Sequence, residues 1–241
     1  MNALLDFVLD AHGGLDEWRK VRRIDVRLTL SGYLFEIKQH PDGLRTALIQ
    51  VQAHRPRTQI TPFPMRGFRG IYEDGRVRIL TDAGAEHSAL DTPRTAYEGH
   101  QRATPWNDLQ FLYFIGYAFW NYFTMPFLLA NDGVVCEELD PHDESGKTWR
   151  VLKASFPDHM DVHCAEQTFY FDEKGHVQRN DYFTDVAKGR VAHYCWDARV
   201  FDGFLFPTRR RVVARDADGR PDLSSPSSVW IDVESVVLSR D

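Results

Sequence analysis

The most informative part of the sequence is DLQFLYFIGYAFWNYFTMPFLLAND, residues 108–132. Between the acids at its two ends, the 22 residues 109–130 carry no charged side chain. An apolar run of roughly 20 residues is long enough to cross a bilayer as a helix. The first question is therefore whether this run spans a membrane or lies inside a folded protein.

The surrounding residues favour a helix inside a folded protein. Thr104 and Pro105 form a typical helix start, an N-cap followed by proline at the first position, and Pro126 predicts the helix end. The result is a helix of about 19 residues, close to 30 Å long. Tyrosine and tryptophan occur throughout it, whereas a membrane span concentrates them at its ends. Its polar residues are Asn107, Asp108, Gln110 and Asn121, and the mean hydropathy of the chain is −0.43. We therefore expect no membrane span.

Two interpretations of this helix stay open. A helix that is apolar on all sides has to be covered on all sides. It is either a core helix that covers a sheet, or a helix that lines an apolar cavity. In the second case the sheet covers one face, and a ligand or a partner covers the other.

Outside the helix, the hydrophobic pattern has the period of two that is typical of strands. Residues 23–32 show it most clearly, since Ile24, Val26, Leu28 and Leu30 alternate with polar residues. Further strands are predicted at 33–38, 45–53, 57–61, 68–73, 76–81, 86–90, 133–139, 148–156, 162–171, 176–186, 190–200, 204–214 and 228–237. Before the first strand, a short amphipathic helix ends at Gly13-Gly14 and a second one covers 15–19.

This order of elements predicts an α+β fold, mainly β, in a single domain over residues 1–241. Long runs of consecutive antiparallel strands usually curl. We expect a curled antiparallel sheet, or incomplete barrel, that is covered by the long central aromatic helix and by the short N-terminal helices.

Composition limits the class of protein. The net charge is −6, and the one tight basic run is Arg209–Arg211, which argues against nucleic acid as a partner. The three cysteines are scattered without a CxxC pair, and no basic segment precedes an apolar run at the N-terminus. We therefore expect a cytoplasmic protein with reduced thiols. No motif for a nucleotide, a nucleophilic serine or zinc is present, and no cofactor is predicted.

The carboxyl-terminal strands predict two sheet faces of different chemistry. Hairpin loops at 172–175 and 187–190 pair Glu166 with Asp181 and Thr184 with His193. A slip of one residue would exchange the faces. The first face carries Cys164, Glu166, Thr168, Tyr170, Arg179, Asp181, Phe183, Tyr194 and Trp196. The second face carries His163, Gln167, Asn180, Tyr182, His193, Cys195 and Asp197.

Each face contains candidate catalytic residues. On the first, Glu166 and Asp181 lie side by side with Arg179 diagonal to them, either as a general acid and base or as a structural ion cluster. On the second, His163 and His193 are neighbours, but a metal needs a further ligand and we predict no metal site. These histidines are either half-exposed on the convex side or general bases in the cavity. His87 and His100 are candidates for the opening of the cavity, with a surface loop as the alternative.

Several segments resemble the LolA/LolB-like lipoprotein-carrier superfamily, in particular its uncharacterised bacterial members. They are AHGGLDEW at 11–18, the strand that ends at Ser31-Gly32, and EQTFYFDEKGHVQRNDY with AHYCWDARVFDGFLFPTRRRV between 166 and 212. The resemblance implies an incomplete antiparallel barrel around a helix, with a cavity for acyl chains or other apolar ligands. The known carriers are exported to the periplasm, so the missing signal leaves the cavity, but not lipoprotein transfer, as the expectation.

We therefore predict a protein that binds an apolar or aromatic small molecule, such as an acyl chain, a polyketide or an isoprenoid, between the sheet and the helix. The alternative is a cofactor-free acid–base enzyme (a cyclase, lyase, dehydratase or isomerase) that uses Glu166, Asp181, His163 or His193. A third hypothesis is a protein partner for the helix, and we expect a monomer or homodimer. The predicted ligand-binding residues are Trp106, Tyr113, Tyr117, Trp120, Arg179, Phe183, Tyr194 and Trp196.

Overall fold

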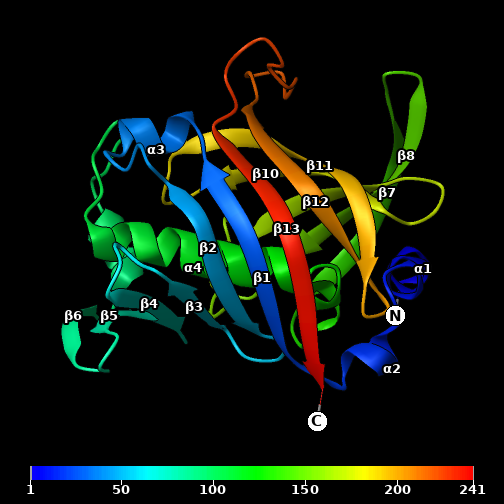
Figure 1. Ribbon diagram of the computed structural model, residues 1–241. Coiled ribbons are helices and arrows are strands. Elements are labelled where there is room, and N and C mark those ends of the chain that lie inside the picture. The colour runs from blue at the N-terminus through cyan, green and yellow to red at the C-terminus, as the bar shows by residue number, and fades with distance from the viewer. Residues whose placement is uncertain (1, 241) are drawn as a thin grey trace.

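The computed structural model describes residues 2–240 and is mainly β (Figure 1). Its helices are α1 (Ala3–Ala11), α2 (Leu15–Trp18), α3 (Tyr33–Ile37), α4 (Asp108–Thr124) and the 3₁₀ helices η1 (Pro93–Tyr97) and η2 (Phe127–Ala130). Its strands are β1 (Val21–Ser31), β2 (Leu44–Gln52), β3 (Arg57–Thr61), β4 (Phe68–Glu73), β5 (Arg76–Thr81), β6 (Glu86–Leu90), β7 (Val135–Glu144), β8 (Lys147–Ser155), β9 (Glu166–Phe171), β10 (Val177–Thr184), β11 (Gly189–Phe201), β12 (Phe204–Ala214) and β13 (Val229–Arg240). The predicted strand at 33–38 was wrong, because that segment forms α3.

The described strands form one antiparallel sheet with the order β6-β5-β4-β3-β2-β1-β13-β12-β11-β10-β9-β8-β7. Two meanders, β1–β6 and β7–β13, meet where β1 pairs with β13. Val26 lies opposite Val236 at this seam, and both side chains are buried. The sheet is not closed, and it curls around α4, which confirms the predicted incomplete barrel (Figure 1).

Helix α4 begins and ends for local reasons. The Asn107 side chain accepts from the Gln110 backbone N–H, and the Gln110 side chain accepts from the Asn107 N–H, which is a capping box. The N-cap is therefore Asn107 and not Thr104, and the helix has 17 residues. It ends at Thr124, just before Pro126, as the sequence predicts. No helix in residues 2–240 is long and apolar enough to cross a membrane.

The sheet covers one side of α4 very closely. Gly116 lies against Tyr72 of β4, and a Cβ at position 116 would overlap with the Tyr72 Cβ. Thr58 of β3 donates its hydroxyl hydrogen bond to the Gly116 carbonyl at 2.9 Å. These contacts fix the distance between the helix and strands β3 and β4, so that the opposite side of α4 faces the second meander.

The short N-terminal helices cover one end of the core. The Asn2 side chain caps α1, and the buried face of this amphipathic helix contains Leu4, Leu5, Val8 and Leu9. Trp18 of α2 stacks on Phe127 with ring centroids 4.3 Å apart and meets Phe204 edge-on. One hydrophobic cluster extends from α1 to β13, so the α4 core is continuous with both meanders.

Candidate functional site

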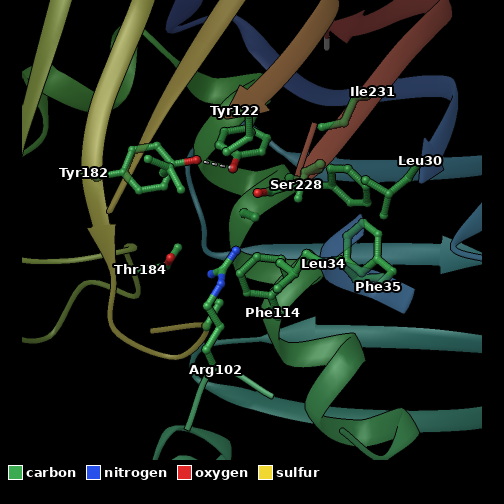
Figure 2. Close-up of a pocket in the computed structure, with 17 residues that line it drawn as sticks. Leu30, Leu34, Phe35, Arg102, Phe114, Tyr122, Tyr182, Thr184, Ser228 and Ile231 are labelled. Carbon is green, nitrogen blue, oxygen red and sulfur yellow. Dashed lines mark hydrogen bonds between the residues drawn. The ribbon is translucent and has the colours of Figure 1, made fainter. Parts of the chain in front are cut away.

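A narrow apolar pocket lies between α4 and the inner face of the sheet (Figure 2). Its walls come mainly from α4, α3, β1 and strands β10–β13. Ile115, Ala118, Phe119 and Tyr122 have the i, i+3, i+4, i+7 spacing that places side chains on one helix face. The lining residues are Leu30, Leu34, Phe35, Arg102, Phe114, Ile115, Ala118, Phe119, Tyr122, Tyr182, Thr184, Ala187, Val191, Val212, Ser228, Val229 and Ile231.

The pocket is almost filled by its own side chains. The space between atoms totals about 460 Å³, but the centre of a water-sized sphere reaches only about 30 Å³ of it. Since roughly 10–15 Å³ of such space holds one water, the pocket in this conformation has room for about two. A larger guest requires lining side chains to move, so this conformation is the closed form of any binding site here.

One end of the pocket meets a buried chain of hydrogen-bonding rings. The hydroxyl of Tyr122 lies 3.1 Å from that of Tyr182, as Figure 2 shows, and 2.8 Å from His163 Nε2. The other ring nitrogen of His163 lies 3.0 Å from the Tyr117 hydroxyl. The Tyr182 hydroxyl lies 3.4 Å from His193 Nδ1. Two pocket-lining tyrosines therefore connect the apolar space to two histidines behind it.

These hydrogen-bonded tyrosine and histidine rings are uncharged at neutral pH. Burial, with a smaller contribution from Arg94, lowers the pKa of His163 to about 3. Burial, followed by the charge of Arg210, also holds the pKa of His193 well below its usual range. Burial raises the pKa values of Tyr122 and Tyr182. The polar end of the pocket therefore offers neutral donors and acceptors rather than a charge.

The opposite end of the pocket is cationic. Figure 2 shows the Arg102 guanidinium directed into the pocket between Thr184 and Phe114. Arg102 belongs to the segment that joins η1 to α4, and that segment is held against α3, since the Trp106 N–H donates to the Lys38 carbonyl at 3.1 Å. The pocket is thus apolar along its walls, neutral and polar at one end, and positive at its mouth.

Known structures share this architecture along nearly the whole chain. A LolA superfamily protein from Nitrosomonas europaea aligns with a TM-score of 0.53 at 11% identity, covering 97% of this chain and 93% of that one. A DUF1329 family protein from Desulfovibrio piger gives a TM-score of 0.58 at 9% identity, covering 98% and 92%. A domain assigned as an outer membrane lipoprotein-sorting protein, from Vibrio parahaemolyticus, gives 0.52 at 8% identity, covering 98% and 91%.

The chain has a LolA-like fold. The resemblance seen in the sequence is thereby confirmed for the fold, which is all that identities this low can show. Comparison with protein-family models gives no match, and neither does comparison with curated proteins.

The LolA-like neighbours also correct the predicted location. We expected a cytoplasmic protein from the N-terminal sequence and the scattered cysteines. The matching structures include a LolA superfamily protein and a lipoprotein-sorting domain, and such carriers are typically periplasmic or extracellular. The cytoplasmic prediction is therefore wrong, because an apparent lack of an export signal and free thiols are weak indicators of compartment.

The LolA-like sheet separates the predicted carboxylate pair. Asp181 lies opposite Thr168, and Glu166 lies opposite Ser155 of β8. The Glu166 side chain is 63% exposed and pairs with Lys153 at 2.7 Å. The predicted Glu166–Asp181 pairing was wrong by two residues: Phe171 pairs with Val177 rather than with His176, and the β9–β10 register shifts once more at an irregularity between Val177 and Arg179. The predicted pairing of Thr184 with His193 was also wrong, since Thr184 pairs with Gly189.

Asp181 and Arg179 form a buried ion pair on the face of the sheet opposite the pocket. Arg179 donates from Nε and Nη2 to the two Asp181 oxygens, both at 2.6 Å, and the Tyr170 hydroxyl donates to Asp181 at 3.0 Å. A small apolar cluster that includes Tyr194 surrounds the pair. Which face points inward was left open by the sequence; this face does not line the pocket, because Tyr182 and Thr184 of the same strand point inward and strand side chains alternate.

The remaining predicted residues lie outside the pocket lining. Phe183 and Trp196 are each 41% exposed on the outer face. The Tyr113 hydroxyl donates to Asp161 at 2.6 Å, and Trp120 Nε1 donates to the Gln52 carbonyl at 3.1 Å. Trp106 packs under Lys38, with Nζ 4.6 Å from the ring centroid. On α4 the predicted ligand-binding residues are the large aromatics, whereas the residues that line the pocket follow the helical spacing around Ala118.

His163 and His193 lie behind the pocket lining. Their side chains are 2% and 1% exposed, so they do not lie half-exposed on a convex surface as one interpretation required. They lie within hydrogen-bond distance of the lining residues Tyr122 and Tyr182, respectively. Within residues 2–240, no group of three His, Cys, Asp or Glu side chains is arranged to hold a metal ion.

Proposed function

We propose that this protein binds an apolar small molecule, with an acyl chain, a polyketide or an isoprenoid as the candidate classes, in the pocket between α4 and the sheet. The main supporting observation is that the apolar helix face at Ile115, Ala118 and Phe119 meets the inner sheet face across a narrow apolar space, which has room for about two waters in this conformation. Apolar concave sites with few polar groups are the usual form of small-molecule sites. The LolA-like fold supports the same coarse conclusion.

Binding requires the closed pocket to open. Arg102 lies at the mouth on the segment before α4, and Thr184 lies there at the end of β10, whereas Ala118 and Ile115 lie on a helix that is packed along its length. We propose that a ligand displaces the mouth residues and the ring of Phe119 while α4 stays in place. The Tyr122–Tyr182 end then supplies a neutral polar contact for the buried end of the guest.

The test is to block the pocket without unfolding the protein. Ala118→Leu adds three carbons to a side chain that faces the pocket, and we expect it to abolish binding of a fluorescent fatty acid. Ala198→Leu makes the same chemical change at an exposed position of β11 and should leave binding unchanged. Val191→Phe, from the opposite wall, repeats the test if Ala118→Leu is unstable.

Extraction of the purified protein with organic solvent, followed by mass spectrometry, identifies any resident molecule. The proposal fails if the stripped wild-type protein binds no fatty acid, isoprenoid or aromatic probe. It also fails if Ala118→Leu and Ala198→Leu bind such a probe equally well, because the pocket would then not be the site.

A second candidate function, the cofactor-free acid–base enzyme, is favoured by one observation. Tyr122 and Tyr182 both line the pocket and lie within hydrogen-bond distance of His163 or His193, so that a proton could pass between a bound molecule and an imidazole. Glu166 and Asp181 lie away from the pocket and are not part of this candidate. The test is to return an extracted ligand to the stripped protein. A changed mass or retention time with wild type, but not with Tyr182→Phe, would support an enzyme.

A further inference from the structure

Arg102 is a cation at the mouth of an apolar pocket, and within residues 2–240 it takes part in no hydrogen bond or ion pair. Its guanidinium lies against the backbone of Gly189, so closely that a Cβ at that position would overlap with Nη1. The Thr184 hydroxyl donates to the Gly189 carbonyl at 2.9 Å and fixes this backbone. Arg102 therefore presents five N–H donors without a protein partner beside the apolar pocket.

A rigid turn holds Arg102 in this place. The Thr104 N–H donates to the Gln101 carbonyl at 3.1 Å, and the Gln101 N–H donates to the Thr104 hydroxyl at 2.9 Å. The buried Lys38 ammonium donates to the carbonyls of the same two residues, at 3.4 Å to Gln101 and 3.1 Å to Thr104. The residues on both sides of Arg102 are thus tied to α3, which keeps its side chain directed at the pocket.

Two further cations, Lys38 and Lys188, lie near Arg102 but outside the pocket lining. Burial, and after it the charge of Arg102, lowers the pKa of Lys38 to about 8, so the two cations act on each other. Burial and the charges of Lys38 and Lys188 likewise lower the pKa of His100, which places Lys188 in the same neighbourhood. In the described part of the chain, no carboxylate forms an ion pair with Arg102, Lys38 or Lys188.

We propose that the pocket selects amphiphiles with an anionic headgroup, a carboxylate or a phosphate held by Arg102, whose apolar tail follows α4 towards Tyr122. This inference rests on the proposed function, since it names the class of ligand for the same pocket. A guanidinium matches both headgroups with paired, charge-assisted hydrogen bonds. A neutral ligand that closed the pocket would instead remove Arg102 from water without a partner, which is unfavourable.

The opposing explanation is that Arg102 only covers the pocket with its aliphatic stem. The two explanations differ in what they predict for ligands with the same tail and different heads. Dodecanoate, dodecyl phosphate and dodecanol form such a series. Each is added below its micelle concentration to stripped protein that carries the neutral dye Nile red, and displacement of the dye gives its Kd.

With wild-type protein, we expect dodecanoate or dodecyl phosphate to bind at least about tenfold more tightly than dodecanol, since only the anions pair with the guanidinium through two charge-assisted hydrogen bonds. Arg102→Gln should remove this preference and leave the Kd of dodecanol unchanged. Arg102→Lys should keep part of it. Arg209→Gln removes an exposed arginine from the outer face, where it pairs with Asp197, and serves as the matched control. The ratio of the Kd values for dodecanoate and dodecyl phosphate shows whether the headgroup preference is that of a fatty acid or of a lipid phosphate.

Two results would overturn this inference and leave the proposed function intact. One is a wild-type protein that binds dodecanol as tightly as both anions. The other is an equal loss of dodecanol and dodecanoate binding in Arg102→Gln, which would mean that Arg102 packs over the pocket. If Nile red and all three amphiphiles fail to bind the wild-type protein, the proposed function itself fails.

Discussion

His163 lies between two phenols, with Tyr117 on Nδ1 and Tyr122 on Nε2. Its ring stacks on the Tyr182 ring, with the two ring centroids 4.3 Å apart. A neutral imidazole carries one N–H and one lone pair, so one phenol accepts from it and the other donates to it. A protonated imidazole would have to donate on both sides inside an apolar core. The core therefore selects the neutral form, and this selection has a measurable consequence.

We expect the free energy of unfolding to fall as the pH drops below about 6.5, and His163 to contribute to that fall. Its pKa is about 3 in the folded protein and 6.5 unfolded, so the unfolded chain binds an additional proton throughout this window. One such proton gives a slope of about 1.4 kcal/mol per pH unit. In urea titrations between pH 6.5 and 4.5, His163→Gln should reduce the slope by up to that amount.

His159→Gln, at an exposed position, is the matched control for this measurement and should keep the wild-type slope. His12 and His193 stay in both proteins, and burial lowers the pKa of each. Some acid sensitivity therefore remains in the variant. An unchanged slope in His163→Gln would mean that the imidazole takes up its proton in the folded state.

For single residues, the sequence predicted which side chains lie together on one face of the sheet, but not whether that face points towards α4 or outward. Arg179 and Asp181 were placed together with Tyr194, and the structure confirms that grouping. Whether this face points inward depends on which side of the sheet meets α4. That is set by the curl of the whole sheet and not by any local sequence pattern. His163 was assigned a neighbour in β11, but its phenol partners come from α4, far away in the sequence.

Among the elements, the predicted strands at 57–61, 68–73, 76–81, 86–90 and 204–214 have the bounds of β3, β4, β5, β6 and β12. The end of α4 was also predicted, because its signals are local. An uncharged run, a proline after it and a polar cap before it give the helix and its end within two residues. The start differed because Asn107 with Gln110 forms a capping box, which competes successfully with the Thr104-Pro105 pair. The short α3 was missed because the mostly apolar segment Tyr33–Ile37 is too short to show a helical period and resembles a strand.

Gly116→Ala in α4 tests whether packing or helix propensity dominates. Propensity alone predicts a gain of about 1 kcal/mol. The new methyl group would overlap with the Cβ of Tyr72, whose backbone is fixed in β4 and whose hydroxyl donates to Asp161 at 2.8 Å. Overpacking costs roughly 1–3 kcal/mol, so we expect a net loss of stability in urea or thermal unfolding. A gain would show that α4 moves easily relative to the sheet.

In residues 2–240, one large core cluster connects the two meanders of the sheet, and a second, small cluster lies on the outer face around Arg179 and Asp181. The cluster that includes Leu4, Tyr72 and Leu238 connects α1, β4 and β13. We propose that residues 1–241 fold as the single domain expected from the sequence. The oligomeric state, monomer or homodimer, stays a prediction that size-exclusion chromatography with light scattering can decide.

A single domain should unfold in one transition. We expect far-UV circular dichroism and tryptophan emission to give the same midpoint, because Trp18, Trp120 and Trp149 lie in different parts of the structure. Leu28→Ala removes a buried side chain opposite Val233 at the seam and should cost roughly 2–5 kcal/mol. Both probes should shift together. Separate midpoints in wild type or variant would show that the two meanders are independent units.

The seam between β1 and β13 also constrains how the chain is made. Roughly 200 residues separate these strands, and a ribosome adds about 5–20 residues per second. For about 10–40 s, the edge of β1 that will receive β13 has no partner strand, while its apolar residues Ile24 and Leu30 are already synthesised. An unpaired strand edge invites pairing with other chains. A chaperone that shields β1 until Val229–Arg240 emerges would therefore raise the yield of folded protein during expression.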